Sequence, residues 1–172
     1  MTAPSLFPAL LALHIAEEAP SFTSWAQRHA SPRYTQHDFV KINAAGLTST
    51  LAVGELVRRA PNNRPLFLAW YTAVLTQQAF FNPLFHAGAT MAFRDYSPGL
   101  VSSFAFPPLW AQVTRAALRD GRLGRRSLSA AIALGGVIHA AAVAQQVFKV
   151  GLPQALSRAS MMRGFTAPPV VK

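Results

Sequence analysis

Three ionisable residues stand together at the end of an apolar segment near the start of the chain. They are His14, Glu17 and Glu18, in the run His-Ile-Ala-Glu-Glu, and they follow mostly apolar residues. On a helix, residues three and four apart share one face, so the imidazole and the carboxyl groups would lie side by side. Carboxylates beside apolar residues are costly unless they are paired, protonated or bound to a cation, and this cost predicts a site.

Polar groups interrupt two other apolar segments. Asn82 and His86 lie in one of them, and His139 lies in the other. Two or three imidazoles with one or two carboxylates form a ligand set for zinc or non-haem iron. We take His14, Glu18, His86 and His139 as candidate metal ligands, and the metal would activate a water molecule as a nucleophile. The chain contains no cysteine, which excludes thiolate ligands, cysteine nucleophiles and disulfides.

A metal-free mechanism uses the same residues. Two adjacent glutamates repel each other, so one of Glu17 and Glu18 can keep its proton and act as an acid while the other acts as a base. His14 would then carry protons, and Asn82 would orient a water molecule or a ligand. We therefore predict His14, Glu17, Glu18 and Asn82 as catalytic residues, and the sequence leaves the choice between the two mechanisms open.

Five long segments must position these residues, and each is typical of a helix. We expect them at residues 6–18, 39–59, 65–93, 100–118 and 127–150. Pro83 predicts a kink or a short break in the third segment, and Pro107 with Pro108 predicts a bend in the fourth. The residues that follow Phe22 are expected to form a polar connection, and residues 94–99 a turn. The alternation typical of strands is weak throughout, so the fold class is all-α.

The composition favours a membrane protein. Apolar residues make up 51% of the chain and charged residues 13%, which is about half the usual charged share of a soluble domain. Residues 65–93, 96–114 and 127–148 contain no Asp, Glu, Lys or Arg, and a membrane span needs roughly 20 apolar residues. We predict an integral membrane protein, a polytopic transmembrane bundle of about five helices in contact with lipids. A soluble all-α domain with buried helices is the alternative.

The net charge of +10 does not indicate nucleic-acid binding in this chain. The basic residues fall between the apolar segments, where membrane proteins meet anionic headgroups. A basic helix with interleaved aromatic residues, which would favour nucleic acid, is not found in the sequence. With five spans, the two sides of the membrane carry equal numbers of basic residues, so this charge does not orient the bundle.

The five-span arrangement also predicts that the candidate residues meet. The first, third and fifth segments end on the side of the membrane where the second begins. At 1.5 Å per residue, His14, His86 and His139 each lie within about 15 Å of that side. The acidic pair and Asn43 lie nearer the same surface. Three distant stretches of chain would therefore bring their polar groups to one half of the bilayer.

Four motifs follow one another along the chain. They are His14-Ile-Ala-Glu17-Glu18, Asn43-Ala-Ala-Gly46, Asn82-Pro-Leu-Phe-His86-Ala-Gly88 and Arg94-Asp-Tyr-Ser-Pro-Gly99-Leu-Val101, with His139 in the last apolar segment. This order, over roughly residues 6–146, resembles the HXXEE-motif family of small integral membrane proteins. The resemblance implies a helical membrane protein with a metal or acid–base site, and it does not imply a substrate. Pro83 after Asn82 departs from the family pattern.

These features predict a membrane-embedded enzyme that acts on a lipophilic small molecule. The expected reaction is a hydrolysis, an epoxide opening, an isomerisation or a cyclisation, with zinc or iron as the expected cofactor. A non-catalytic membrane scaffold or assembly factor is the alternative. A proton-coupled transporter is less favoured because the chain is short and lacks inverted repeats. We expect residues 1–155 to form one helical membrane domain and residues 156–172 a flexible basic tail.

Overall fold

The computed structural model describes residues 3–150, and in this part of the chain every regular element is helical. The elements are α1 (Ala3–Glu18), α2 (Phe22–His29), α3 (Gln36–Arg59), α4 (Arg64–Trp70), the π-helical η1 (Tyr71–Phe81), α5 (Asn82–Phe93), α6 (Leu100–Ser103), α7 (Phe106–Arg119), α8 (Arg125–Ala142) and the π-helical η2 (Val143–Val147). The all-α prediction is therefore confirmed for these residues. The expected tail at residues 156–172 lies outside the described residues.

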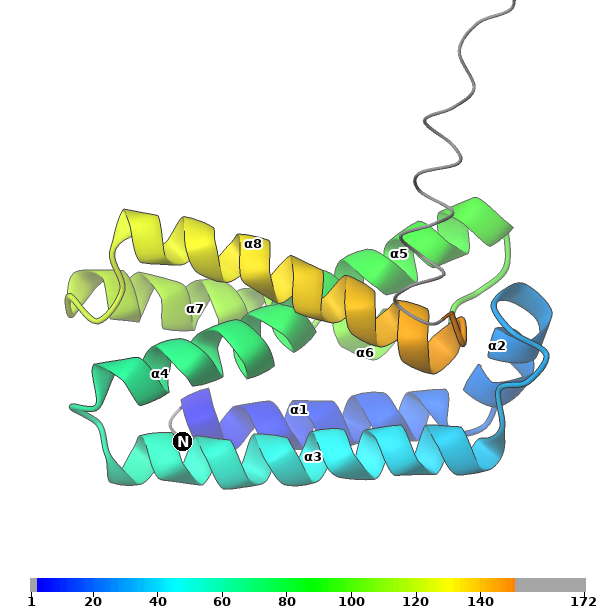
Figure 1. The fold of residues 1–172 in the computed structure, drawn as a ribbon, viewed down its shortest axis with the longest axis horizontal. Helices are drawn as coiled ribbons and strands as arrows, with labels where there is room; N and C mark the ends of the chain where they lie inside the picture. Colours follow the sequence, from blue (N-terminus) through cyan, green and yellow to red (C-terminus); the bar gives the residue numbers. More distant parts are fainter. Residues whose placement is uncertain (1–2, 151–172) are drawn as a thin grey trace, which may run out of the picture.

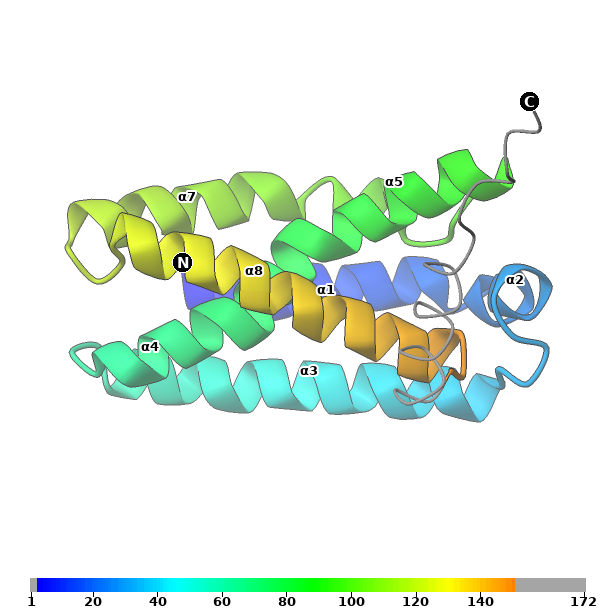
Figure 2. The same cartoon turned by 45° about the horizontal axis from the view of Figure 1, so that its top comes forward.

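The helices form an elongated bundle in which α1, α3, α7 and α8 run along the long axis (Figures 1 and 2). Helix α1 packs against α3, α6 and α7, while η1 packs against α4, α5, α7 and α8. Two apolar clusters fill the interior. One surrounds Phe7, Tyr71 and Phe106, and the other surrounds Trp25 and Tyr34. The last turns of α1, which carry the acidic pair, lie at the end of the bundle where α2 is found.

The five expected segments are all present, and their ends differ for local reasons. Helix α3 begins three residues early because Thr35 and Asp38 form a capping box, in which each side chain accepts a hydrogen bond from the other residue's backbone N–H. The fourth segment breaks at Phe104 and Ala105, before its prolines, because proline at the first turn of α7 needs no N–H partner. The chain stays helical through Asn82 and Pro83, where η1 gives way to α5.

The expected polar connection after Phe22 is wrong in part, because residues 22–29 form helix α2. This helix is amphipathic and buries Phe22, Trp25 and Ala26. At its end His29 stacks on Phe93, with the ring centroids 4.8 Å apart. Asp95 lies 2.7 Å from His29 Nε2, and hydrogen bonds from His29 and Arg28 lower the pKa of the Asp95 carboxyl. Helix α2 thereby holds the loop that follows α5.

One helix among the described residues, Arg125–Val147, is long and apolar enough to cross a membrane. Its 23 residues span about 35 Å at 1.5 Å per residue. The helix over residues 64–93 is longer, but polar residues such as Gln77 and Asn82 lower its hydropathy. The all-α bundle is therefore established, and the five membrane spans remain a prediction.

Two glycines allow α8 to lie close to η1. A Cβ atom added at Gly135 would meet Thr76 Cγ2 at 3.1 Å and the Thr72 carbonyl oxygen at 3.2 Å. A Cβ atom added at Gly136 would meet the Phe81 ring at 2.8 Å. Larger side chains at either position would force the two helices apart, and the interior is too tightly packed to absorb the change.

We predict that Gly135→Leu lowers the free energy of unfolding by about 1–3 kcal/mol, because the leucine overpacks the contact with η1. Gly88→Leu is the matched control, since a Cβ atom at Gly88 meets nothing within 4 Å. The control is expected to be neutral or slightly stabilising, because leucine is the better helix former. Denaturant unfolding followed by circular dichroism measures both. Equal losses in the two variants would contradict the close contact.

Candidate functional site

A histidine–glutamate cluster lies where α1 and α5 approach each other. His14 and Glu18 come from successive turns at the end of α1, and His86 comes from α5. All three side chains are buried, with relative exposures of 2%, 7% and 1%. The Nε2 atoms of His14 and His86 both lie 3.5 Å from the same oxygen, Glu18 Oε1. One atom from each residue can be chosen so that all three lie within 4.8 Å of one another.

Two serines hold the outer nitrogens of the two imidazoles. His14 Nδ1 lies 2.9 Å from Ser102 Oγ, and His86 Nδ1 lies 2.9 Å from Ser97 Oγ. Ser102 Oγ donates to the Gly99 carbonyl oxygen, so it accepts the proton of His14 Nδ1. The Nε2 atom of His14 then carries a lone pair directed toward the cluster. Such outer hydrogen bonds fix the ring orientation and the tautomer of histidines that bind metals.

The inner nitrogens differ in their partners. Asn82 Nδ2 lies 2.8 Å from His14 Nε2 and donates to its lone pair. His86 Nε2 is buried and has no hydrogen-bond partner among the described residues. A buried polar atom without a partner is costly and needs an explanation. Here the atom faces Glu18, so a cation or a proton between them would satisfy it.

The carboxyl group of Glu18 is buried, and the ionisable groups that face it are two imidazoles. Among residues 3–150, the ion pairs of Glu18 are those with His14 and His86, and neither Lys nor Arg pairs with it. An isolated carboxylate in a protein interior is strongly disfavoured unless an opposite charge is nearby. The buried carboxyl group is therefore stabilised in one of three ways: it keeps its own proton, it faces a protonated imidazole, or it binds a metal ion.

Glu17 points away from this cluster and binds the turn before α6. Its carboxylate accepts hydrogen bonds from the backbone N–H groups of Gly99, Val101 and Ser102, at 3.2, 3.2 and 2.7 Å, and from the Tyr96 hydroxyl. A carboxylate at the C-terminus of α1 is opposed by the dipole of its own helix. The N–H groups at the start of α6 supply the compensation. Glu17 thus ties residues 96–102 to α1.

Gly99 allows this turn to lie directly against the cluster. Its φ angle of 96° is in the left-handed region that glycine adopts without strain. A Cβ atom here would lie 2.6 Å from His14 Cε1, 2.9 Å from His86 Cε1 and 3.0 Å from Glu18 Cγ. Any other residue would displace the three side chains of the cluster. The turn is therefore one wall of the site.

A cavity of about 100 Å³ adjoins the cluster. It lies where the two apolar clusters of the bundle meet, because its walls include Leu11 from one and Phe22 from the other. The polar side chains that line it are His14, Glu18, Tyr34, Asn43, Gln77, Gln78, Asn82, His86, His139 and Gln146. The cavity therefore joins the cluster to polar residues of α3, η1 and α8.

A family model described as a protein of unknown function with HXXEE motif matches residues 5–114. The chain belongs to this HXXEE family. The match covers more than half of the chain and includes the motif itself, His14 to Glu18, together with His86 and the Ser97–Gly99 turn. His139 lies beyond it. No curated protein and no solved structure matches the chain.

The structure brings four of the expected residues of this HXXEE protein together, namely His14, Glu18, Asn82 and His86. His139 lines the same cavity, but it lies outside the group of ligating atoms and its Nδ1 is 3.3 Å from Gln77 Nε2. Glu17 lies outside the cavity, so the expected acid–base pair of adjacent glutamates is not formed by side chains that face each other.

Sequence reasoning missed the residues that support the cluster. Ser97 and Gly99 belong to residues 94–99, which were expected only as a turn, and Ser102 belongs to the fourth expected helix, residues 100–118. The positions of Ser97 and Gly99 in the family motif were a signal, but serine and glycine are common in turns for reasons of backbone geometry alone. Tyr34, which lines the cavity, carried no signal in the sequence.

We predict that Gly99→Ala destabilises the protein by more than Gly121→Ala. Both glycines have positive φ angles, 96° and 69°, so both variants carry a similar backbone cost of about 1–2 kcal/mol. A Cβ atom at Gly121 meets nothing within 4 Å, so overpacking adds about 1–3 kcal/mol to the Gly99 variant alone. Denaturant unfolding of both variants measures the difference. Equal destabilisation would contradict the close approach of the turn to the cluster.

Proposed function

We propose that this protein is a membrane-embedded enzyme that acts on a lipophilic small molecule at a metal centre formed by His14, Glu18 and His86. The observation that carries the metal is the pair of separations between Glu18 Oε1 and the Nε2 atoms of His14 and His86. The two 3.5 Å separations from Glu18 Oε1 exceed the 2.7–3.2 Å range of a hydrogen bond. Nitrogen and oxygen atoms bound to one tetrahedral zinc ion at their usual lengths lie about 3.3 Å apart.

Two histidines and one carboxylate suit a catalytic rather than a structural metal. Catalytic zinc sites and non-haem iron sites use three protein ligands and leave a position open, and His₂Glu sets occur in both. The metal would supply Lewis acidity and a water molecule activated at neutral pH. Ser97 and Ser102 would hold the two imidazoles in place, and Asn82 would orient the water or the substrate. His139 would carry protons from the far side of the cavity.

One contact favours the metal-free alternative. Asn82 Nδ2 occupies the lone pair of His14 Nε2, so this amide must turn away before His14 can bind a metal. Without a metal, Glu18 and a neighbouring imidazole would share a proton and act as acid and base. Such a pair would open an epoxide, shift a double bond or start a cyclisation. Glu17 would keep its structural role in both mechanisms.

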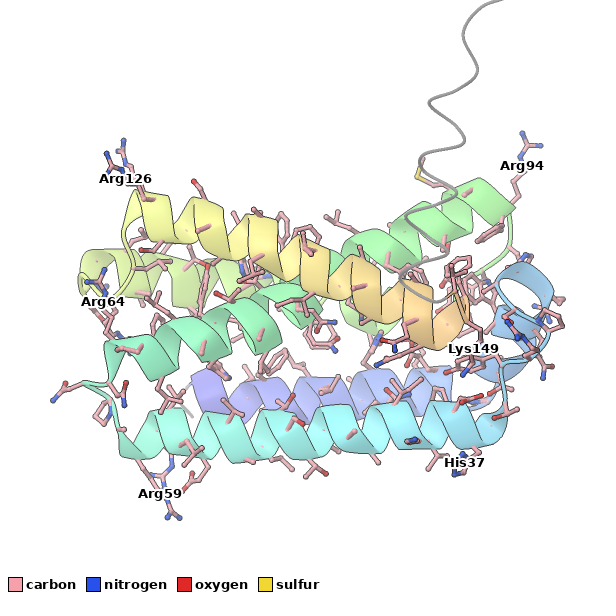
Figure 3. The ribbon with its side chains drawn as sticks, viewed as in Figure 1. His37, Arg59, Arg64, Arg94, Arg126 and Lys149 are labelled. Atoms are coloured by element: carbon pink, nitrogen blue, oxygen red, sulfur yellow. The ribbon has the colours of Figure 1, made fainter. Side chains whose placement is uncertain are left out.

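The distribution of charge supports the membrane location. The labelled basic residues lie at the two ends of the bundle, with Arg59, Arg64 and Arg126 at one end and Arg94 and Lys149 at the other (Figure 3). Large apolar side chains are exposed on helices that run between these ends. They include Leu13, Leu51, Met91, Val101, Leu134 and Val137, each more than half exposed. An apolar belt between two charged ends is the pattern of a membrane protein.

The alternative of a membrane scaffold or assembly factor does not account for the buried cluster. The Glu18 carboxyl group is buried and pairs with neither Lys nor Arg among the described residues, and His86 Nε2 is buried with no hydrogen-bond partner there. Both features cost folding free energy, and a purely structural role would not require them. A proton-coupled transporter would use such groups as a relay. Movement of a substrate across sealed vesicles would distinguish transport from catalysis.

We predict that the purified protein binds one zinc, iron or cobalt ion per chain and that His86→Ala and Glu18→Gln lose it. Ser97→Ala is expected to weaken the affinity by about 10–100-fold, because His86 loses its outer hydrogen bond. His37→Ala is the control, since this histidine is exposed at the start of α3. Elemental analysis and titration of the metal-free protein with Co²⁺ measure the effect. Unchanged metal content in both ligand variants would exclude this centre.

We predict that the two ends of the bundle lie on opposite sides of a membrane. The chain has no cysteine, so Arg126→Cys and Arg94→Cys each introduce one thiol. A membrane-impermeant maleimide should label one variant only in right-side-out vesicles and the other only in inside-out vesicles. Val137→Cys, which lies on the apolar side of α8, is the unlabelled control. Labelling of both ends from one side would contradict the membrane-spanning bundle.

A further inference from the structure

The cavity beside the cluster is too small for a lipophilic molecule. Its volume of about 100 Å³ is less than that of a 150 Å³ cavity that accommodates benzene. Only the reacting group of a substrate and a few neighbouring atoms would fit there. If the proposed function is correct, the remainder of a lipophilic substrate must lie elsewhere on the protein.

An apolar groove of about 630 Å³ lies on the outside of the bundle, next to this cavity. It runs between the start of α5 and the end of α8 with η2, and α5 and α8 diverge toward this end of the bundle in both views (Figures 1 and 2). The residues that line it are Phe81, Leu84, Phe85, His139, Ala140, Val143, Ala144, Phe148 and Val150. All of them except His139 are apolar, as a surface for hydrocarbon requires.

Three side chains form a common wall between the groove and the cavity. Phe85, His139 and Val143 line both. The Phe85 ring lies 5.2 Å from the ring of His86 on one side and 6.1 Å from that of His139 on the other. The groove therefore ends one side chain away from the histidine–glutamate cluster.

The groove and the cavity differ in polarity, and this difference sets which end of a ligand would lie in each. The groove offers hydrocarbon surface, while the cavity offers amides, imidazoles and the Glu18 carboxyl. His139 is the polar member of the shared wall, and its Nε2 atom is buried without a hydrogen-bond partner among the described residues. A polar group that passes from the groove to the cavity would meet this nitrogen first.

We propose that the groove between α5 and η2 holds the hydrocarbon tail of the substrate while its polar reacting group enters the cavity past Phe85, His139 and Val143. This assignment rests on the proposed function and specifies its substrate class as an amphiphile with a long alkyl or isoprenoid chain. The substrate reaches the site sideways from the bilayer. His139 would contact the polar group of the substrate on this route.

Photolabelling of the full chain in lipid nanodiscs tests the route. Two palmitate probes are used, one with a diazirine near the carboxyl group and one with a diazirine near the methyl end. The first should label Phe85 or His139, and the second should label groove residues such as Leu84 and Phe148, as mapped by mass spectrometry. Labelling spread evenly over the apolar sides of the bundle, or absent from both groove and cavity, would overturn the proposal.

A pair of tryptophan variants gives the matched comparison. Ala140→Trp fills the groove, whereas Val137→Trp adds the same side chain to α8 at an exposed position outside it. Ala140→Trp should reduce labelling of Phe85 and His139 by the first probe several-fold, and Val137→Trp should leave it unchanged. Equal labelling of the two variants would overturn the proposal. Residues 137 and 140 are both exposed, so neither substitution is expected to disturb folding.

The metal content of the same samples separates this proposal from the proposed function. Groove labelling in a protein that binds no metal would contradict the metal centre and leave the tail-binding groove in place. A bound metal without groove labelling would contradict the groove and leave the centre in place.

Discussion

The buried carboxyl group of Glu18 is the constraint around which this end of the bundle is built. Among the described residues it pairs with neither Lys nor Arg, and two imidazole nitrogens face one of its oxygens. Serine hydroxyls fix those imidazoles from outside, and the serines belong to a segment held against α1 by Glu17. Removal of any of these contacts would leave charge or polar atoms buried without compensation. The result is a buried cluster of two imidazoles and one carboxyl group whose orientations are fixed by their neighbours.

The helices could be predicted from the sequence because charge-free runs and proline or polar turns mark their extents. Helix α2 was not predicted because most of residues 22–29 are polar. Its burial depends on two aromatic side chains, Phe22 and Trp25, which contact a distant part of the chain. The π-helical character of η1 and η2 was not readable either.

The sequence predicted how far along each helix the site residues lie, but not which way their side chains face. Helical spacing places His14 beside Glu18, and the order of segments brings His86 and Asn82 to the same level. Depth along a helix, however, does not say which way a side chain faces. Neighbouring residues on a helix point about 100° apart, so Glu17 leaves the cluster that Glu18 joins. His139 likewise reaches the cavity without joining the ligating atoms, because the rotation of α8 is set by packing.

Glu17 and Glu18 have different roles, and this difference affects how sequences of the family should be compared. One acid clamps a turn and the other faces two imidazoles, although they are adjacent in the motif. Across relatives, the residue at position 17 should covary with residues 96–102, whose backbone N–H groups bind it. The residue at position 18 should covary with the two histidines of the cluster. An alanine scan that scores only loss of activity would assign both acids the same role. Coevolution between alignment columns would separate them.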